Sequence, residues 1–300
     1  MKLKINLLGF CLLTGCLFTG LFFNLAIGAS VNPCVLDSAQ WTYQVTKFNS
    51  DGKPQIVGTV LQKLVPNPNP NPNLNKNITS DNNQFPYALT SSMGVKFFMM
   101  SDTIQENSTG YISNQNGVVS EAYGAGDSKG YKKVSVSIDP PYQGKIRVLV
   151  NNNGKKKILS LPALSPLGDN LNIILSLRWA LIQSALNHQD SPKRFMHMVI
   201  SNNAQGELMP MPYVFLKQEN ENNNHHNGAT SSLKTALGVL KTVEYTRYDN
   251  VADEQDYYWF AVDKNYLPVK ITSEKKNSVV SSLDINTYTP ANGCVVMVKK

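Results

Sequence analysis

Histidine is the side chain best suited to acid–base chemistry near neutral pH. The sequence contains four histidines, at His188, His197, His225 and His226. The adjacent pair lies in an asparagine-rich stretch, where a dedicated metal site would need further fixed ligands. His197 alternates with methionines, which indicates a strand position. These residues by themselves predict neither a metal site nor a catalytic base.

Sequence motifs of known chemistry give no better candidate. The chain has no Walker loop, no His-Glu-x-x-His and no paired-cysteine metal motif. The glycine-rich stretch "YGAGDSKG" lies between strand patterns rather than before a helix, so it predicts a flexible turn and not a phosphate cradle. We expect a protein that is not an enzyme and has no metal and no cofactor. A hydrolase assembled from distant Ser, His and Asp residues is the third and last alternative.

Arg178 is a lone cation in the middle of an apolar segment, next to Trp179. Its aliphatic stem could cover apolar surface while the guanidinium reaches water or an acidic partner. Alternatively, the guanidinium could bind an anionic head group at the mouth of a cavity. The sequence leaves both interpretations open.

The segment that carries Arg178 is the one clear helix pattern in the chain. "GDNLNIILSLRWALIQSALNH" has helical spacing, and Asp169 can cap its start. Its polar residues form one narrow stripe, and the rest of its circumference is apolar. The stripe consists of Asn172, Ser176, Gln183 and Asn187. A helix with this composition is normally buried against other elements.

Elsewhere the hydrophobic pattern has a period of two, with turn residues between short segments. "WTYQVTKF" and "QIVGTVLQKL" flank Asn49-Ser50-Asp51-Gly52, and "YKKVSVSID" alternates between apolar and polar side chains. We therefore predict a mainly β fold, in which a large curved antiparallel sheet, like a half-barrel, packs on one main helix in its concave face.

An aromatic hairpin, "YYWFAVDKNYLPVKI" at 257–271, supplies much of the apolar surface of this sheet. The hypothesis of a binding face places one set of residues along the concave side. These are Phe97, Phe98, Arg178, Trp179, Tyr258, Trp259 and Phe260. The competing interpretation is that the same aromatic side chains fill an ordinary core.

The N-terminus predicts export. Two lysines precede a long apolar run, and small residues follow at 26–28, so residues 1–29 are typical of a secretory signal peptide. An uncleaved membrane anchor is one alternative. A lipid on Cys16 is another, because Leu13-Thr14-Gly15-Cys16 is similar to a bacterial lipobox. We expect a periplasmic protein that associates with the membrane only if it is anchored or lipidated.

After the signal peptide, residues 30–300 are predicted to form one β-rich domain. Polar loops at 66–83 and 218–232 interrupt it, because "PNPNPNPNLNKN" and "ENENNNHHNG" cannot form strands. The domain retains two cysteines, Cys34 and Cys294, which we expect to pair in an oxidising compartment. The net charge of +7 comes partly from lysine runs beside turns, so no nucleic-acid partner is expected.

Two motifs resemble a bacterial exported family, the domain of unknown function 3108. One is the helix with Asp169, Leu171, Leu177 and Arg178, and the other is the pair of strands with Trp259, Phe260 and "LPV" at 267–269. The resemblance implies a β-rich exported protein without an established activity, and by analogy the half-barrels that carry lipoproteins. Two hypotheses follow: a lipid or acyl chain bound on the concave face, or an envelope scaffold that binds another protein through loops or a sheet edge.

Overall fold

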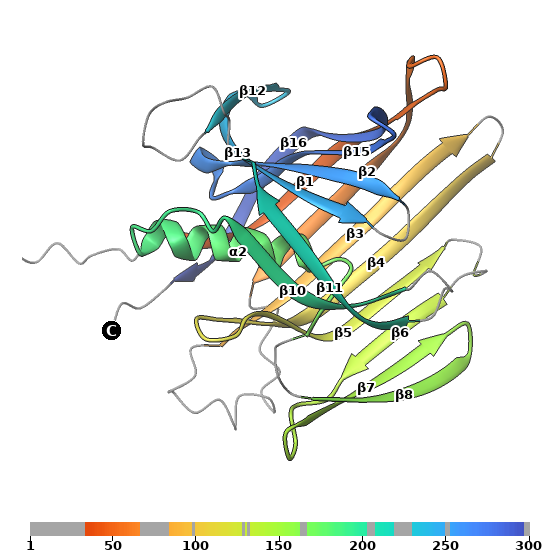
Figure 1. Ribbon diagram of the computed structural model, residues 1–300, viewed down its shortest axis with the longest axis vertical. Helices are drawn as coiled ribbons and strands as arrows, with labels where there is room; N and C mark the ends of the chain where they lie inside the picture. Colours follow the sequence, from red (N-terminus) through yellow and green to blue (C-terminus); the bar gives the residue numbers. More distant parts are fainter. Residues whose placement is uncertain are drawn as a thin grey trace, which may run out of the picture. The chain divides into compact units, whose positions relative to one another are not determined.

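The computed structural model describes residues 34–66, 84–97, 100–127, 130, 133–162, 167–202, 208–218, 230–249 and 253–296. Residues 34–295 form one compact unit, and residues 1–33 with 296–300 form another. Everything that follows concerns the first unit, which is drawn with its elements labelled in Figure 1.

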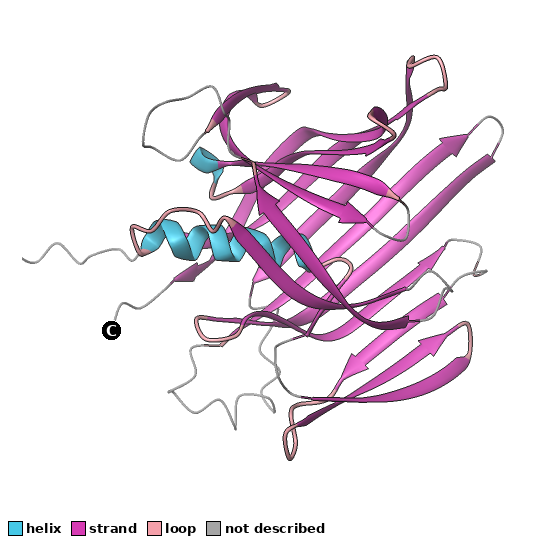
Figure 2. Cartoon of the chain, viewed as in Figure 1, coloured by secondary structure: helices cyan, strands magenta, loops and turns pink. Residues whose placement is uncertain are grey.

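Strands make up most of this unit, as Figure 2 shows in magenta. Those of the first half are β1 (Cys34–Phe48), β2 (Pro54–Pro66), β3 (Phe85–Phe97), β4 (Met100–Ser113), β5 (Gly117–Asp127), β6 (Lys133–Ile138), β7 (Lys145–Asn152), β8 (Lys155–Pro162) and β9 (Leu167–Asp169). After the helix α2 (Ile173–Leu186) come β10 (Arg194–Asn202), β11 (Leu208–Lys217), β12 (Ser231–Thr235), β13 (Gly238–Asp249), β14 (Glu254–Ala261), the short 3₁₀ helix η1 (Val262–Lys264), β15 (Leu267–Lys275) and β16 (Ser278–Val296).

All sixteen strands of the described residues belong to one sheet. Their order is β8-β7-β6-β5-β4-β3-β2-β1-β16-β15-β14-β13-β11-β10-β9, with β12 paired to β13. The predicted fold class, a large curved sheet with one main helix, is confirmed. In β6, Val136 and Ile138 are buried while Ser135 and Ser137 are exposed, as the alternating pattern predicted.

The predicted hairpin turns form where the sequence indicated. Between β1 and β2, the N–H of Gly52 donates to the carbonyl of Asn49 at 2.8 Å. Between β7 and β8, Asn153 and Gly154 both have positive φ, at 50° and 85°. Two such residues in succession match the right-handed twist of the flanking strands.

One strand pair departs from the predicted antiparallel sheet. β9 and β10 run parallel, with Met198 opposite Leu167 and Ile200 opposite Asp169. Parallel neighbours need a long crossover connection, and α2 supplies it. The helix is therefore part of the chain's route from one strand to the next as well as part of the core.

The sheet curves around α2, which contacts β5, β9, β10 and β15. Bulges contribute to this curvature, because each extra residue bends its strand. They occur at Val45/Thr46, Thr109/Gly110, Trp259/Phe260 and Ser273/Glu274. The last strand in the order, β9, also contacts β5. The part of the sheet that runs from β5 through β1 and β16 to β9 therefore encloses the helix.

α2 is buried on almost all sides. Leu177 and Leu181 are fully buried in a core with Val199, Phe215 and Phe260. The predicted polar stripe does not face water along its whole length, since Asn172 and Ser176 are also buried. The side-chain amide of Asn172 donates to the hydroxyl of Tyr87 in β3, and the hydroxyl of Ser176 donates to the backbone carbonyl of Asn172.

Several predictions concern residues that lie outside the described part of the chain. These are the signal peptide at 1–29, lipidation at Cys16 and nearly all of the two polar loops. Strands do reach into the loop boundaries, because Pro66 ends β2 and Ser231 begins β12. Cys34 and Cys294 lie in β1 and β16, which are neighbours in the sheet, but their side chains are not described. Their disulfide stays a prediction.

Candidate functional site

A cavity of about 140 Å³ lies between α2 and the concave face of the sheet. On the helix side its wall consists of Asn170, Leu171, Ile174, Leu175 and Arg178. On the sheet side the lining residues are Trp41, Tyr43, Gln62, Leu89, Glu106, Pro268 and Ile271. We call this space the helix cavity. Its wall is mostly apolar, with a few polar groups that could orient a ligand.

Arg178 forms one end of the helix cavity. Its side chain is only 2% exposed, and its Nε donates to the carbonyl of Asn265 at 2.8 Å. Asn265 follows η1 with a φ of 49°, so the arginine holds the turn that leads into β15. In the first interpretation drawn from the sequence, the guanidinium reaches water or an acidic partner, and its burial excludes water. The arginine is buried, and it lines a cavity.

The opposite end has a negative charge. Glu106, from β4, accepts a hydrogen bond from the hydroxyl of Tyr123 at 2.6 Å. The residues that line the sheet side come from β4, β3, β2, β1 and β15. Arg178 binds the carbonyl of Asn265, which lies just before β15. The carboxylate and the guanidinium therefore lie toward opposite ends of the helix cavity, with apolar residues between them.

The walls are fixed by hydrogen bonds of their own. The hydroxyl of Tyr43 donates to the carbonyl of Pro268 at 2.8 Å, and the indole N–H of Trp41 donates to Gln62 Oε1 at 2.9 Å. Burial raises the pKa of the Tyr43 hydroxyl, which stays neutral at physiological pH. Such preorganised walls lower the conformational cost of binding.

The volume limits what this cavity can hold. Sites that enclose drug-sized ligands usually measure about 300–1,000 Å³. The helix cavity, at about 140 Å³, can hold a short chain or the end of a longer one. A complete acyl chain cannot be enclosed here, because the helix itself fills the concave face.

A second group of polar side chains, around Asp169, is buried from solvent. Asp169 Oδ2 accepts from Ser108 Oγ at 2.6 Å and from Ser120 Oγ at 2.5 Å. Its Oδ1 accepts from the backbone N–H groups of Leu171 and Asn172, each at 2.9 Å. The predicted cap at Asp169 is wrong, because Asn172 is the N-cap of α2 and makes no side-chain cap hydrogen bond. Asp169 instead binds N–H groups of the turn before the helix and joins β9 to β4 and β5. Burial raises the pKa of its carboxyl, against the opposing effect of these bonds.

His197 lies against the same turn. A Cβ added at Gly168 would come within 2.8 Å of the His197 ring, so glycine is required for this approach. The histidine ring stacks with Phe195 at 6.1 Å, and its Nε2 has no hydrogen-bond partner among the described residues. Burial lowers the pKa of His197 to about 4, so the imidazole is neutral at pH 7.

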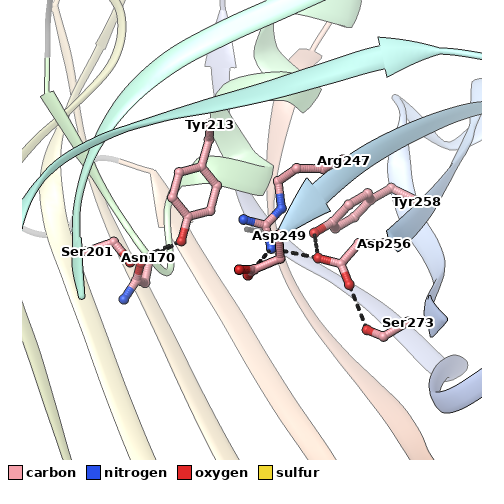
Figure 3. A network of polar contacts seen from close by, with 8 residues as sticks. All are labelled: Asn170, Ser201, Tyr213, Arg247, Asp249, Asp256, Tyr258 and Ser273. Carbon is pink, nitrogen blue, oxygen red and sulfur yellow. Dashed lines mark hydrogen bonds and ion pairs between the residues drawn. The ribbon is translucent and has the colours of Figure 1, made fainter. Parts of the chain in front are cut away.

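A third polar group surrounds Arg247 on the concave face, as Figure 3 shows. Arg247 Nη2 donates to Asp256 Oδ2 at 2.6 Å and to Asp249 Oδ2 at 2.9 Å. Its guanidinium carbon lies 4.3 Å from the centre of the Tyr213 ring. The hydroxyls of Ser273 and Tyr258 donate to the Asp256 carboxylate. The guanidinium is paired with two carboxylates, while its Nε is buried without a hydrogen-bond partner among the described residues. We assign this group a role in joining β13 to β14.

The aromatic residues predicted to line one face of the sheet lie on two different faces. Tyr258 and Phe260 point inward and belong to the buried core, together with Phe215 and Tyr245. Trp259 points to the other face, where Lys270 Nζ lies 5.7 Å from its ring centre. Alternate residues of a strand face opposite sides, so these three neighbours cannot line one concave surface. This part of the predicted site is wrong in its geometry.

The remaining predicted residues are also apart from the helix cavity or outside the description. Trp179 is buried, does not line the cavity, and its indole N–H has no hydrogen-bond partner among the described residues. The side chain of Phe97, in β3, and the whole of Phe98 are not described. Among the predicted ligand contacts whose side chains the structure describes, only Arg178 lines the helix cavity.

Sequence reasoning missed Trp41, Tyr43, Glu106 and Arg247. The first two were recognised only as part of a strand, although their alternation marked the inward face. Glu106 and Arg247 gave no signal, because their partners lie on other strands.

Reasoning from the sequence also missed the Gly-x-Ser-x-Gly spacing at 126–130. Ser128 lies outside the described residues. The described elements before and after it, β5 and β6, are antiparallel strands, whereas a nucleophile elbow needs a strand followed by a helix. Within the described residues, no group of three potential metal ligands occurs, and no helix is long and apolar enough to cross a membrane.

No family model matches the chain, and no curated protein matches it. Among solved structures, it is similar to a β-barrel-like protein of the domain of unknown function DUF1849 from Brucella abortus. The identity is 9% over 86% of this chain and 99% of that chain, with a TM-score of 0.49. It is also similar to a protein described as exported, with a YmcC-like fold, from Bacteroides fragilis, at 10% identity over 85% and 96% of the two chains and a TM-score of 0.26.

A porin-like protein from Bacteroides uniformis matches at 10% identity over 86% of this chain and 98% of that chain, with a TM-score of 0.26. Similarities at this level carry no statement about activity, ligand or location. The resemblance to the domain of unknown function 3108 likewise stays a prediction, since no family model matches.

Proposed function

We propose that this is an exported, non-enzymatic protein of the bacterial cell envelope that binds a short amphipathic anion in the helix cavity. The observation that carries the proposal is the buried Arg178 at one end of a preorganised, largely apolar cavity. The anionic end of the ligand would accept hydrogen bonds from the guanidinium, and its apolar body would lie along Leu171, Ile174 and Leu175. The proposed location rests on the signal-peptide pattern at 1–29.

The charges at the two ends predict selectivity. A monocarboxylate can place its charge at Arg178 and its methyl end toward Glu106. A dicarboxylate of the same length would bring a second negative charge toward Glu106, which costs free energy in a site with little water. We therefore expect monocarboxylates to bind and dicarboxylates of equal length to be rejected.

The absence of enzymatic activity is part of the proposal. Ser108 and Ser120 are the serines bonded to Asp169, and they are 0% and 1% exposed. A nucleophile at either position could not reach a substrate without opening the fold. Their hydroxyl protons are also already donated to the carboxylate, which suits a structural role.

Calorimetric titration with a series of straight-chain monocarboxylates tests the proposal. Each methylene that enters the cavity should tighten binding about fourfold, from about 0.8 kcal/mol per buried methylene. The gain should stop once the chain exceeds the cavity. Arg178→Gln should weaken binding at least tenfold, since a hydrogen bond to a charged group contributes about 1.5–3 kcal/mol.

Two further variants keep the result interpretable. Ile174→Phe fills the helix cavity without removing the arginine, and it should also abolish binding. Arg147→Gln removes an arginine whose side chain is 62% exposed, and it should bind as the wild type does. No binding at any chain length, or equal binding by wild type, Arg178→Gln and Ile174→Phe, would refute the proposal.

The scaffold alternative has an observation of its own. An open groove of about 840 Å³ runs over β4–β8 and is lined by Gln105, Asn107, Gly124, Ser135, Asn151 and Lys156, among others. Among the described strands, β8 beside it pairs only with β7, so its other edge has no described partner. Polar side chains next to a free edge suit an extended partner chain. Cross-linking from an Asn151→Cys variant to an envelope protein, lost when a proline replaces Ile158 on β8, would favour this second function.

A further inference from the structure

The two ends of the helix cavity differ in their access to solvent. At one end Arg178 is 2% exposed, and Tyr43, which also lines the cavity, is 1% exposed. We call this the closed end. At the other end the lining residues Gln62, Glu106 and Asn170 are only half-buried, and we call this the open end. A ligand whose anionic group lies at Arg178 therefore places its other end among three polar side chains.

Glu106 supplies a negative charge at the open end. Its Oε1 accepts from the hydroxyl of Tyr123 at 2.6 Å, which holds the carboxylate in place. A carboxylate has about four acceptor sites, so this bond leaves capacity for a donor on a ligand. Gln62 and Glu106 both lie opposite Ser91 of β3, one on each side, so they belong to the same face of the sheet. Carboxylate and amide oxygens on one face can accept hydrogen bonds from an ammonium group.

The polar group next to the open end also has an excess of negative charge. Asn170 accepts from the hydroxyl of Tyr213 at 3.4 Å, and the ring of Tyr213 lies against Arg247 (Figure 3). This guanidinium is paired with two carboxylates, those of Asp249 and Asp256, so one negative charge remains in this group. The whole chain, in contrast, has a net charge of +7. The local charge favours a cation at the open end.

From these observations we infer that the ligand of the helix cavity is an ω-amino carboxylate, a short chain with a carboxylate at one end and an ammonium group at the other. The inference rests on the proposed function and names its ligand class. The carboxylate accepts hydrogen bonds from Arg178 at the closed end, and the ammonium group donates to Glu106 at the open end. Contact with solvent there lowers the cost of removing water from the ammonium group.

The separation of the two charges distinguishes this class from its relatives. In an α-amino acid the ammonium group is attached to the carbon that bears the carboxylate, so the two charges cannot reach opposite ends of the cavity. A monocarboxylate makes no ion pair with Glu106, and a dicarboxylate brings a second negative charge toward it. A diamine brings a positive charge toward Arg178, where like charges repel in a site with little water. Each of these ligands lacks one of the two attractive contacts.

Calorimetric titration of the full chain with a set of six-carbon ligands tests the inference. The set consists of ε-aminocaproate, caproate, adipate, norleucine and hexamethylenediamine, which differ in the sign and the position of their charges. We expect ε-aminocaproate to bind about tenfold more tightly than caproate, because one hydrogen bond between charged groups contributes about this factor. Adipate, norleucine and hexamethylenediamine should each bind at least tenfold more weakly than ε-aminocaproate.

Glu106→Gln separates the charge of the open end from its shape. The glutamine oxygen can still accept from Tyr123, so the wall of the cavity is retained. This variant should lose the tenfold preference for ε-aminocaproate over caproate, and it should bind adipate more tightly than the wild type does. A gain in adipate binding cannot result from a damaged fold. The matched control is Asp139→Asn, which removes a carboxylate whose side chain is 53% exposed and should bind all five ligands as the wild type does.

Equal binding of ε-aminocaproate and caproate by the wild type, or an unchanged preference in Glu106→Gln, would overturn the inference. So would binding of norleucine or hexamethylenediamine as tight as that of ε-aminocaproate, because the site would then not distinguish the separation or the sign of the charges. In any of these cases, caproate binding that is lost in Arg178→Gln would leave the proposed function standing. Binding of none of the five ligands would refute both.

Discussion

His197 makes the stability of the fold sensitive to acid. The residue is 9% exposed, and burial lowers its pKa to about 4 from the 6.5 of an unfolded chain. Between these two pH values the unfolded state binds one more proton than the folded state. The free energy of unfolding should therefore be unaffected by this group above pH 6.5 and fall by 1.36 kcal/mol per pH unit below it. The total loss is about 3 kcal/mol by pH 4, with no further loss from this group below that.

A difference measurement isolates this contribution from other titrating groups. Asp169, whose pKa burial raises, works in the opposite direction, because its protonation at low pH relieves a buried charge. Urea unfolding of wild type and His197→Gln, followed by tryptophan fluorescence from pH 7 to pH 4, cancels the Asp169 effect. The wild type should lose about 3 kcal/mol relative to the variant over this range.

The control is His188→Gln, which removes an exposed histidine just after α2. It shows how much the removal of any histidine changes the curve. A wild-type minus His197→Gln difference that stays flat within about 1 kcal/mol from pH 7 to pH 4 would refute the burial argument. So would an NMR titration of the His197 ring with its midpoint near pH 6.5.

Two further stability predictions follow from the packing. Arg247→Met leaves Asp256 without its cation and should lower the free energy of unfolding by about 3 kcal/mol in urea titrations. Arg147→Met removes an exposed ion pair, in which Arg147 Nε lies 3.9 Å from Asp139 Oδ2, and should cost less than about 1 kcal/mol. Equal losses would contradict the difference in burial. Gly168→Ala should cost about 1–3 kcal/mol because its Cβ meets the His197 ring, and adding His197→Ala should recover part of that loss in a double-mutant cycle. An additive cycle would show that the His197 ring is not the cause, and would leave Asn172 Oδ1, which lies 2.8 Å from the same Cβ position, as the source of the loss.

The sequence by itself determined the class of fold and the single main helix. Alternation in segments such as "KVSVSID" needs only local sterics and one apolar surface, so it predicts strands whatever their partners are. The apolar circumference of the segment around Arg178 likewise required burial, although the helix begins after Asn172 and not at the predicted cap Asp169. These features depend on neighbours within a few residues along the chain.

Tertiary structure decided what the buried residues do. From the sequence, Trp259 and Phe260 are predicted to lie in one aromatic cluster. In the strand their side chains lie on opposite faces. Glu106, Trp41 and Arg178 line one cavity although they come from three distant segments. The parallel pair of β9 and β10 and the partners of Arg247 also arise only when the sheet closes around α2. Register and curvature bring such residues together, and neither is encoded within any short stretch of sequence.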